Sequence, residues 1–321
     1  AIVNKLKNEN NLEYTINQIS CANGAKQSVC NTILVLVNPG DEVIIPAPFW
    51  VSYPEMVKLA EGKPVIVPAG IEQDFKITPA QLEAAITPKT KALILCSPSN
   101  PTGSVYSAEE LAGLAEVLKK HPEIIVIADE IYEHINYIGK HHSIAHIEGM
   151  KERTVIVNGV SKAYAMTGWR IGWLAAPKDV AKAIDSFQSH ATSNPTSIAQ
   201  YATLAALNGS EEELERMRSI FNDRRKFMIS RIREIEHLDC IEPDGAFYIM
   251  LIVKGLYGKR YNGRKINGSM DVADMLLEKG VAVVPGIAFG DDECVRLSYA
   301  ISKEDIAEGL ARIEQFVREV F

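Results

Sequence analysis

Two basic residues, Lys162 and Arg170, stand eight positions apart at the end of an apolar run, Val155–Val157. A lysine amine on a loop can attack the carbonyl of a cofactor and form a Schiff base. An arginine nearby can hold a phosphate by two parallel hydrogen bonds. Taken alone, the pair fits equally well a solvated lysine beside an unrelated arginine. The elements that position the two residues decide between these interpretations.

Short apolar runs alternate with longer helical patterns from residue 16 onward. Strands are expected at 16–21, 42–46, 64–68, 91–96, 123–128, 153–158 and 170–176, and helices at 25–37, 51–61, 79–86, 107–120, 178–190 and 195–208. Strands that alternate with helices predict a mostly parallel sheet with helices on both faces. The fold class is therefore α/β, a three-layer sandwich.

The link from residue 158 to residue 170 is too short for a crossover helix. We therefore expect the strand at 170–176 to be the one antiparallel strand of the sheet. Its first residues then lie at the edge where the parallel strands end. This places Arg170 near Lys162.

The pattern changes after about residue 210. A long charged helix is expected at 211–236, strands at 246–252, 281–284 and 294–299, and a last helix at 303–319. This pattern predicts a smaller C-terminal α+β domain. We place the large domain at 1–215 and the small domain at 216–321.

Polar residues follow several of the expected strands. Asn23–Gln27 opens a helix, Asn100 stands between prolines, and Asp129 and Tyr132 follow an apolar strand. Ligands of open α/β sheets bind beyond the carboxyl ends of the strands. Helix starts also attract phosphate. An amine, a carboxylate and a phosphate cradle at one edge are what pyridoxal 5′-phosphate requires.

The motifs around these residues are similar to those of the class I, fold-type I pyridoxal-phosphate aminotransferases, through nearly the whole chain. The motifs are Ser99-Asn100-Pro101-Thr102-Gly103, Asp129-Glu130-Ile131-Tyr132, Ser161–Arg170 and Arg296-Leu297-Ser298-Tyr299-Ala300. Pro48–Tyr53 and Gly24–Gln27 resemble the bacterial-type aspartate and glutamate/aspartate–prephenate aminotransferases. The resemblance implies a homodimer that transfers amino groups from an amino acid to a 2-oxo acid.

The same resemblance implies a role for each site residue. Lys162 would bind the cofactor aldehyde and carry the proton, and Asp129 would keep the ring nitrogen protonated. Asn100 and Tyr132 would bond the ring's phenolic oxygen, and Trp50 would stack on the ring. The phosphate would meet Gly24, Ala25, Lys26, Ser161 and Arg170. Arg296 would hold the substrate α-carboxylate, beside Trp50 and Asn100.

Lys26 gives the best indication of the substrate. In the resembling subgroup this lysine meets a distal carboxylate, which favours aspartate and glutamate and leaves prephenate open. Lys26 can instead simply assist the phosphate. A C–S β-lyase on the same scaffold, or a sensor module that binds the cofactor without turnover, are the rival functions.

Two departures from the family pattern are visible. Gly159 stands three residues before Lys162, where many relatives carry a hydroxyl; Ser161 can substitute, or the phosphate relies on Arg170 and the helix start. The chain also opens where relatives have a preceding N-terminal segment, so we expect the natural one to be absent. The pattern of residues 2–7 predicts the later part of a helix.

Composition excludes other classes of function. A net charge of −7 gives no electrostatic case for nucleic acid, and no apolar run is long enough for a membrane span. Five cysteines without a CxxC pair indicate reduced thiols and a cytoplasmic protein. His141, His142 and His146 lack metal-ligand spacing and are expected in a solvated loop. The basic stretch 254–265 is expected to be a solvated loop, with a lid near the substrate as the alternative.

Overall fold

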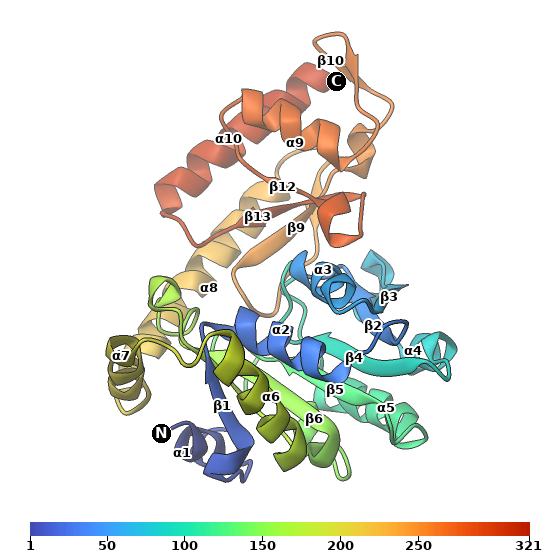
Figure 1. Cartoon of the computed structure of the whole chain (residues 1–321). Helices are drawn as coiled ribbons and strands as arrows, with labels where there is room; N and C mark the ends of the chain where they lie inside the picture. The colour runs from blue at the N-terminus through green and yellow to red at the C-terminus, as the bar shows by residue number, and fades with distance from the viewer.

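The computed structural model describes residues 1–321 as two sheets with their helices, connected through one long helix (Figure 1). The larger sheet has seven strands in the order β1-β7-β6-β5-β4-β2-β3. These strands are β1 Ile19–Ala22, β2 Glu42–Ala47, β3 Lys63–Pro68, β4 Thr90–Cys96, β5 Ile125–Asp129, β6 Thr154–Gly159 and β7 Gly172–Ala175.

Helices cover both faces of this sheet because its central strands are apolar on both sides. One face packs against α2 Ala25–Leu36, α3 Ser52–Leu59 and α6 Lys178–Ala191. The other face packs against α4 Pro79–Ala85 and α5 Ala108–Lys119. Neighbouring residues of one strand pack on opposite faces of the sheet. In β4, Ile94 packs on the face covered by α2, α3 and α6, and Leu93 packs on the face covered by α4 and α5. The expected three-layer α/β sandwich is confirmed.

Strand β7 is antiparallel to both of its neighbours, β6 and β1, and the other adjacent pairs are parallel. Gly159 at the end of β6 is paired with Gly172 at the start of β7. The loop between them therefore begins and ends at one edge of the sheet. This confirms the expected antiparallel strand and brings Lys162 and Arg170 to that edge.

The C-terminal part is built on a four-stranded antiparallel sheet in the order β12-β13-β9-β8. Its elements are α8 Glu212–Ile232, β8 Asp239–Cys240, β9 Tyr248–Ile252, α9 Ser269–Glu278, β12 Val284–Pro285, β13 Cys294–Ser298 and α10 Lys303–Val320. They share one core, in which Ile249, Val295 and Phe316 are fully buried. The expected boundary after residue 215 falls inside α8 and stays a prediction.

Some local expectations needed correction. Residues 16–18 form a 3-10 turn rather than the start of β1, and helix α9 and strand β8 were not expected. The basic stretch 254–265 is largely exposed, as expected, but it contains a short hairpin of β10 Arg260–Tyr261 and β11 Arg264–Lys265. This hairpin lies at the far end of the small sheet from the large one (Figure 1), so it is not a lid.

The remaining helices are short. Helix α1 Ile2–Asn8 agrees with the helical pattern at the start of the chain, and α7 Ser197–Leu207 agrees with the expected helix at 195–208. The 3-10 turns lie at Ile16–Gln18, Ile71–Gln73, Ile144–His146, Lys151–Arg153, Thr167–Trp169, Lys254–Leu256 and Gly286–Phe289. All five cysteines are free thiols, and none of the helices has the length and apolarity that a membrane span requires.

His141 is a further correction, because it is buried rather than solvated. Its Nε2 lies 3.1 Å from a carboxylate oxygen of Glu130, which is also buried. Burial lowers the pKa of His141, but the charge and hydrogen bond of Glu130, together with the charge of Glu133, outweigh burial and raise it. His141 was expected to be solvated because no local pattern in the sequence indicates its contact with Glu130.

Candidate active site

A cavity of about 310 Å³ opens at the carboxyl edge of the large sheet and is closed on one side by the small sheet. Most of the residues singled out from the sequence line it. They are Ala25, Lys26, Trp50, Asn100, Asp129, Tyr132, Ser161, Lys162, Arg170 and Arg296. Gly24 is at the margin of the cavity, against the guanidinium of Arg170. The structure thus brings together side chains from six separate segments of the chain.

Lys162 lies on the loop after β6, with its Nζ 5.8 Å from the ring centroid of Tyr132 and 5.6 Å from that of Phe247. Burial lowers the pKa of this amine, and the charges of Arg170 and Arg296 lower it further. A lysine with a lowered pKa offers more neutral amine at physiological pH, which is the form that attacks a carbonyl. The surroundings of Lys162 therefore suit a nucleophile and a base.

Asp129 is the last residue of β5 and is buried beneath the cavity. Burial raises the pKa of its carboxyl, and the hydrogen bonds it accepts counteract that rise. Tyr53 donates from its hydroxyl to Oδ2 at 2.6 Å, and the backbone N–H of Ile131 donates to Oδ1 at 3.3 Å. Such a carboxylate is a ready partner for a cationic nitrogen in the cavity.

An anion cradle lies at the start of α2. Gly24 is the N-cap residue at φ 85°, and Arg170 donates from Nη2 to the carbonyl of Asn23 at 3.1 Å. A Cβ at Gly24 would collide with the Arg170 guanidinium, and one at Gly172 would collide with the backbone of Gly24 and Ala25. Glycines at these two positions allow β7, Arg170 and the helix start to converge where an anion would bind.

The absence of a hydroxyl-bearing side chain at position 159 has a structural cause. A Cβ on Gly159 would lie 2.8 Å from the Ile171 carbonyl oxygen and 2.9 Å from the Gly172 Cα. The close pairing of β6 with β7 therefore leaves no room for a side chain. Ser161 and Thr167 both line the cavity nearby, so hydroxyl groups are present on the same loop.

Trp50 and Lys26 stand at the mouth of the cavity. The Lys26 Nζ is 4.9 Å from the Trp50 ring centroid, in a cation–π contact. Trp50 also meets the ring of Tyr53 edge-on at 5.2 Å. The indole therefore offers a flat face to the cavity, with a positive charge at its outer side.

Arg296 of β13 reaches into the cavity from the small sheet. It donates from Nη1 to Oδ1 of Asn100 at 2.7 Å, and its Cζ lies 4.3 Å from the ring centroid of Tyr248 and 4.9 Å from that of Phe289. Because Asn100 accepts through Oδ1, its amide nitrogen is left to donate into the cavity. Two aromatic rings and Asn100 therefore hold the Arg296 guanidinium in place, and a fixed guanidinium suits a bidentate bond to a carboxylate.

Sequence reasoning missed several lining residues, namely Tyr53, Cys96, Ile131, Thr167 and Tyr248. Tyr53 had a usable signal, because it belongs to the same Pro48–Tyr53 motif as Trp50, whose ring it meets at 5.2 Å. Tyr248 had a weaker signal, as a hydroxyl in an otherwise apolar strand, Tyr248–Ile252. Cys96 could be found only by pairing the strands, which sets it opposite Asp129.

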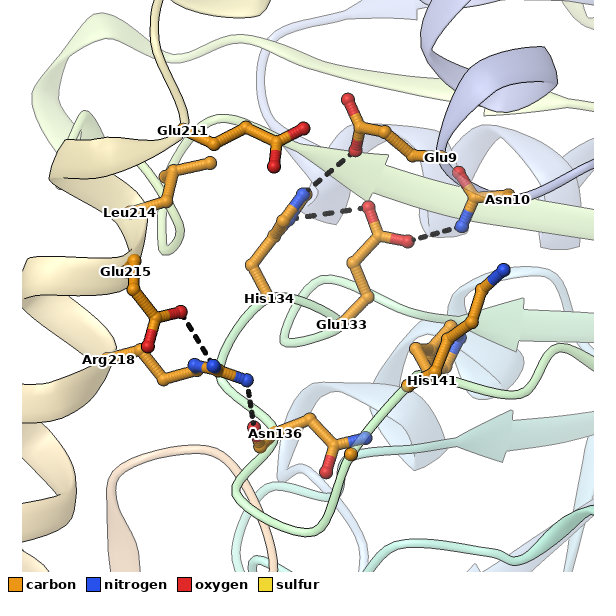
Figure 2. A pocket seen from close by; sticks show the side chains of 12 residues that line it. Glu9, Asn10, Glu133, His134, Asn136, His141, Glu211, Leu214, Glu215 and Arg218 are labelled. Carbon is orange, nitrogen blue, oxygen red and sulfur yellow. Dashed lines mark hydrogen bonds and ion pairs between the residues drawn. The ribbon is translucent and has the colours of Figure 1, made fainter.

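A second cavity, of about 360 Å³, lies between α1, the segment after β5 and the start of α8 (Figure 2). Its lining is charged, but the charges meet partners within the chain. Glu133 accepts from Lys5 and Asn10, Glu9 Oε2 accepts from His134 Nε2 at 3.0 Å, and Arg218 is paired with Glu215 at 2.6 Å. Arg218 also donates from Nη1 to the carbonyl of Asn136 at 3.3 Å, which joins α8 to the large domain, and these contacts give no argument for a ligand.

Comparison with known proteins identifies relatives for the whole arrangement. The model of the family described as aminotransferase class I and II matches residues 1–313. A bifunctional aspartate aminotransferase and glutamate/aspartate-prephenate aminotransferase of Petunia hybrida is 48% identical over 321 residues, which covers 98% of this chain and 67% of that protein. An aspartate/prephenate aminotransferase of Cereibacter sphaeroides is 49% identical, over 98% of this chain and 80% of that protein.

A solved structure has the same fold. The aspartate aminotransferase from Rhizobium meliloti superposes with a TM-score of 0.97 at 44% identity, over 100% of this chain and 81% of that chain. The agreement includes the seven-stranded mixed sheet and the smaller antiparallel sheet.

Proposed function

The chain belongs to the class I and II aminotransferases, and from that premise we propose that it transfers the amino group of aspartate or glutamate to a 2-oxo acid, with prephenate among the acceptors. The observation that carries the proposal is one cavity holding a buried lysine, a buried carboxylate, an anion cradle and an arginine clamp. Relatives named for aspartate and prephenate support the choice of substrates.

Pyridoxal 5′-phosphate is the cofactor that these residues fit. The glycine-lined start of α2, with Arg170, matches a phosphate, and the buried Asp129 matches a ring nitrogen that carries a proton. Lys162, with its lowered pKa, matches an aldehyde. When bound, this cofactor supplies the aldehyde that takes the amino group and a ring that withdraws electrons from the substrate α-carbon.

The chain's own residues divide the remaining work. Asp129 holds the proton on the ring nitrogen, and Asn100 and Tyr132 donate to the phenolic oxygen. The Lys162 amine would take the proton from the substrate α-carbon and deliver it to the carbon that was the cofactor aldehyde, and it would move the proton back in the second half-reaction. Trp50 covers one face of the ring and limits the access of water. Arg296 orients the substrate through its α-carboxylate, so that the α-hydrogen faces Lys162.

Preference for acidic substrates would depend on Lys26. Its ammonium lies 4.9 Å from the Trp50 ring centroid, and both residues line the cavity. A substrate whose α-carboxylate is bound by Arg296 can extend its side chain toward that charge.

The proposal is tested by adding aspartate alone to the cofactor-loaded protein. An aminotransferase converts the bound cofactor to its amine form and releases oxaloacetate, in equal amounts. A β-lyase instead releases ammonia and pyruvate from a cysteine conjugate without this conversion, and a sensor module changes neither. Restoration of the aldehyde form by 2-oxoglutarate or prephenate then identifies the acceptor.

We include in the proposal that the working form is a homodimer. Ile198, Tyr201 and Leu204, spaced by three residues on α7, have exposed fractions of 73%, 74% and 43%. An exposed apolar stripe of this kind is typical of a protein interface. Light scattering on the purified protein tests it. The cytoplasmic location expected from the cysteines stays a prediction.

A further inference from the structure

Two buried tyrosines from different sheets share a hydrogen bond at the back of the cavity. The hydroxyl oxygens of Tyr132, after β5, and Tyr248, in β9, are 3.0 Å apart, and either atom can be the donor. Both side chains are more than nine-tenths buried, and both line the cavity. Their rings meet edge-on with centroids 6.0 Å apart. This is a hydrogen bond between the two domains that is shielded from water.

Counting protons restricts the direction of that bond. Burial raises the pKa of both hydroxyls, so each keeps its single proton at neutral pH. In the proposed function the Tyr132 hydroxyl donates its hydrogen bond to the phenolic oxygen of the cofactor. The Tyr132 oxygen can then only accept, which leaves Tyr248 as the donor between them. Without the cofactor either direction is open, so cofactor binding would fix the direction.

We propose that Tyr248 is a positioning residue that acts through Tyr132: it donates to the Tyr132 hydroxyl and so strengthens the bond from Tyr132 to the phenolic oxygen of pyridoxal phosphate. The inference rests on the proposed function and adds a residue to it. Hydrogen bonds in a chain polarise one another, so a donor behind Tyr132 makes Tyr132 a better donor. A better-stabilised phenolic oxyanion lowers the basicity of the adjoining imine nitrogen on Lys162.

Tyr248 also lies against the substrate clamp. The Arg296 Cζ lies 4.3 Å from the Tyr248 ring centroid, while the Tyr248 hydroxyl meets Tyr132. One side chain of the small sheet therefore contacts both the residue that would hold the α-carboxylate and the residue that would hold the ring oxygen. The two contacts are separable, because Tyr248→Phe removes only the hydroxyl and keeps the ring under Arg296.

The test is a pH titration of the visible absorption of the cofactor-loaded protein, which reports protonation of the cofactor's link to Lys162. In Tyr248→Phe the midpoint should rise by roughly 0.1–0.7 pH unit, because polarisation adds about 10–30% to a hydrogen bond with a charged oxygen. Tyr132→Phe should raise it by at least as much. The double variant should match Tyr132→Phe alone, because Tyr248 acts only through Tyr132. The KM for aspartate should change less than twofold in Tyr248→Phe.

Tyr137→Phe is the matched control. Tyr137 donates from its hydroxyl to the Ala246 carbonyl at 2.6 Å, in the same junction between the domains but outside the cavity. The midpoint of the absorption titration of Tyr137→Phe should equal that of the unsubstituted protein. An unchanged midpoint in Tyr248→Phe, or shifts that add in the double variant, would overturn the inference. If the cofactor-loaded proteins still convert aspartate in either case, the proposed function stands and only this inference fails.

Discussion

Removing the Tyr53 hydroxyl tests how Asp129 is kept ionised in a buried position. Tyr53 donates to Asp129 Oδ2 at 2.6 Å, and Tyr53→Phe deletes this donor while the ring still packs in the same core. A hydrogen bond to a charged group is worth about 1.5–3 kcal/mol. Its loss should therefore raise the pKa of the Asp129 carboxyl by about 1–2 units above its already raised value.

A neutral Asp129 cannot pair with a protonated ring nitrogen. We therefore expect Tyr53→Phe to weaken cofactor binding by up to about 10- to 150-fold, the equilibrium factor for that loss of free energy. The sign of the pH dependence follows from the raised pKa. The carboxylate is lost as pH falls, so the loss of affinity in Tyr53→Phe should begin at higher pH than in the unsubstituted protein and grow on acidification.

The assay is a fluorescence or dialysis titration of the cofactor-free protein with pyridoxal phosphate between pH 5.5 and 8.5. Tyr106→Phe is the control, since Tyr106 is a buried tyrosine whose hydroxyl accepts from the Ile77 N–H at 2.9 Å outside the cavity. In an Asp129→Ala background, Tyr53→Phe should have no further effect on affinity. Equal affinity for Tyr53→Phe and the unsubstituted protein at pH 5.5, or an effect that persists without Asp129, would refute the reasoning.

Two further predictions concern the substrate and the stability of the fold. Lys26→Ala should lower kcat/KM for aspartate and glutamate by about ten- to a hundredfold, since a charged hydrogen bond is worth roughly 1.5–3 kcal/mol. The kcat/KM values for alanine and phenylalanine should stay nearly unchanged. Equal losses for all four substrates would exclude the distal-carboxylate role. Glu133→Gln should destabilise the protein by up to about 3–5 kcal/mol in urea unfolding, because the buried Lys5 ammonium loses its nearest carboxylate and keeps only Glu9 at 3.7 Å and Asn10 Oδ1 at 2.7 Å. Burial raises the pKa of Glu133, but Lys5, His134 and His141 together lower it further, so the stability from this pair should be lost only in acid, below the ordinary glutamate pKa. Stability that is unchanged in Glu133→Gln would contradict a pair that holds the fold.

The sequence predicted the large sheet well because its signals were local. Apolar runs such as Ile125–Ala128 are typical of strands covered on both faces, and the short link before Arg170 permitted only an antiparallel return. Because parallel strands end at one edge, the residues after each strand could be collected into one site before their distances were known. Lys162, Asp129 and Asn100 were found in this way.

The parts that escaped prediction depend on contacts between distant segments. Nothing near Tyr248 in sequence indicates that its hydroxyl meets Tyr132, 116 positions away, in the other domain. His141 was misjudged for the same reason, since its partner Glu130 is buried on the inner side of a loop. Helix α9 follows Gly268 without a side-chain cap, so the usual signal for its start was missing.

The central claim is that Lys162 is the residue that bonds the cofactor. Treating the cofactor-loaded protein with borohydride should attach the reduced cofactor irreversibly, and peptide mass spectrometry should then find the added mass on Lys162. Lys162→Ala should take up cofactor without forming this attachment. Label on Lys26 or on any other lysine of the unsubstituted protein, or attachment that persists in Lys162→Ala, would contradict the assignment of the active site.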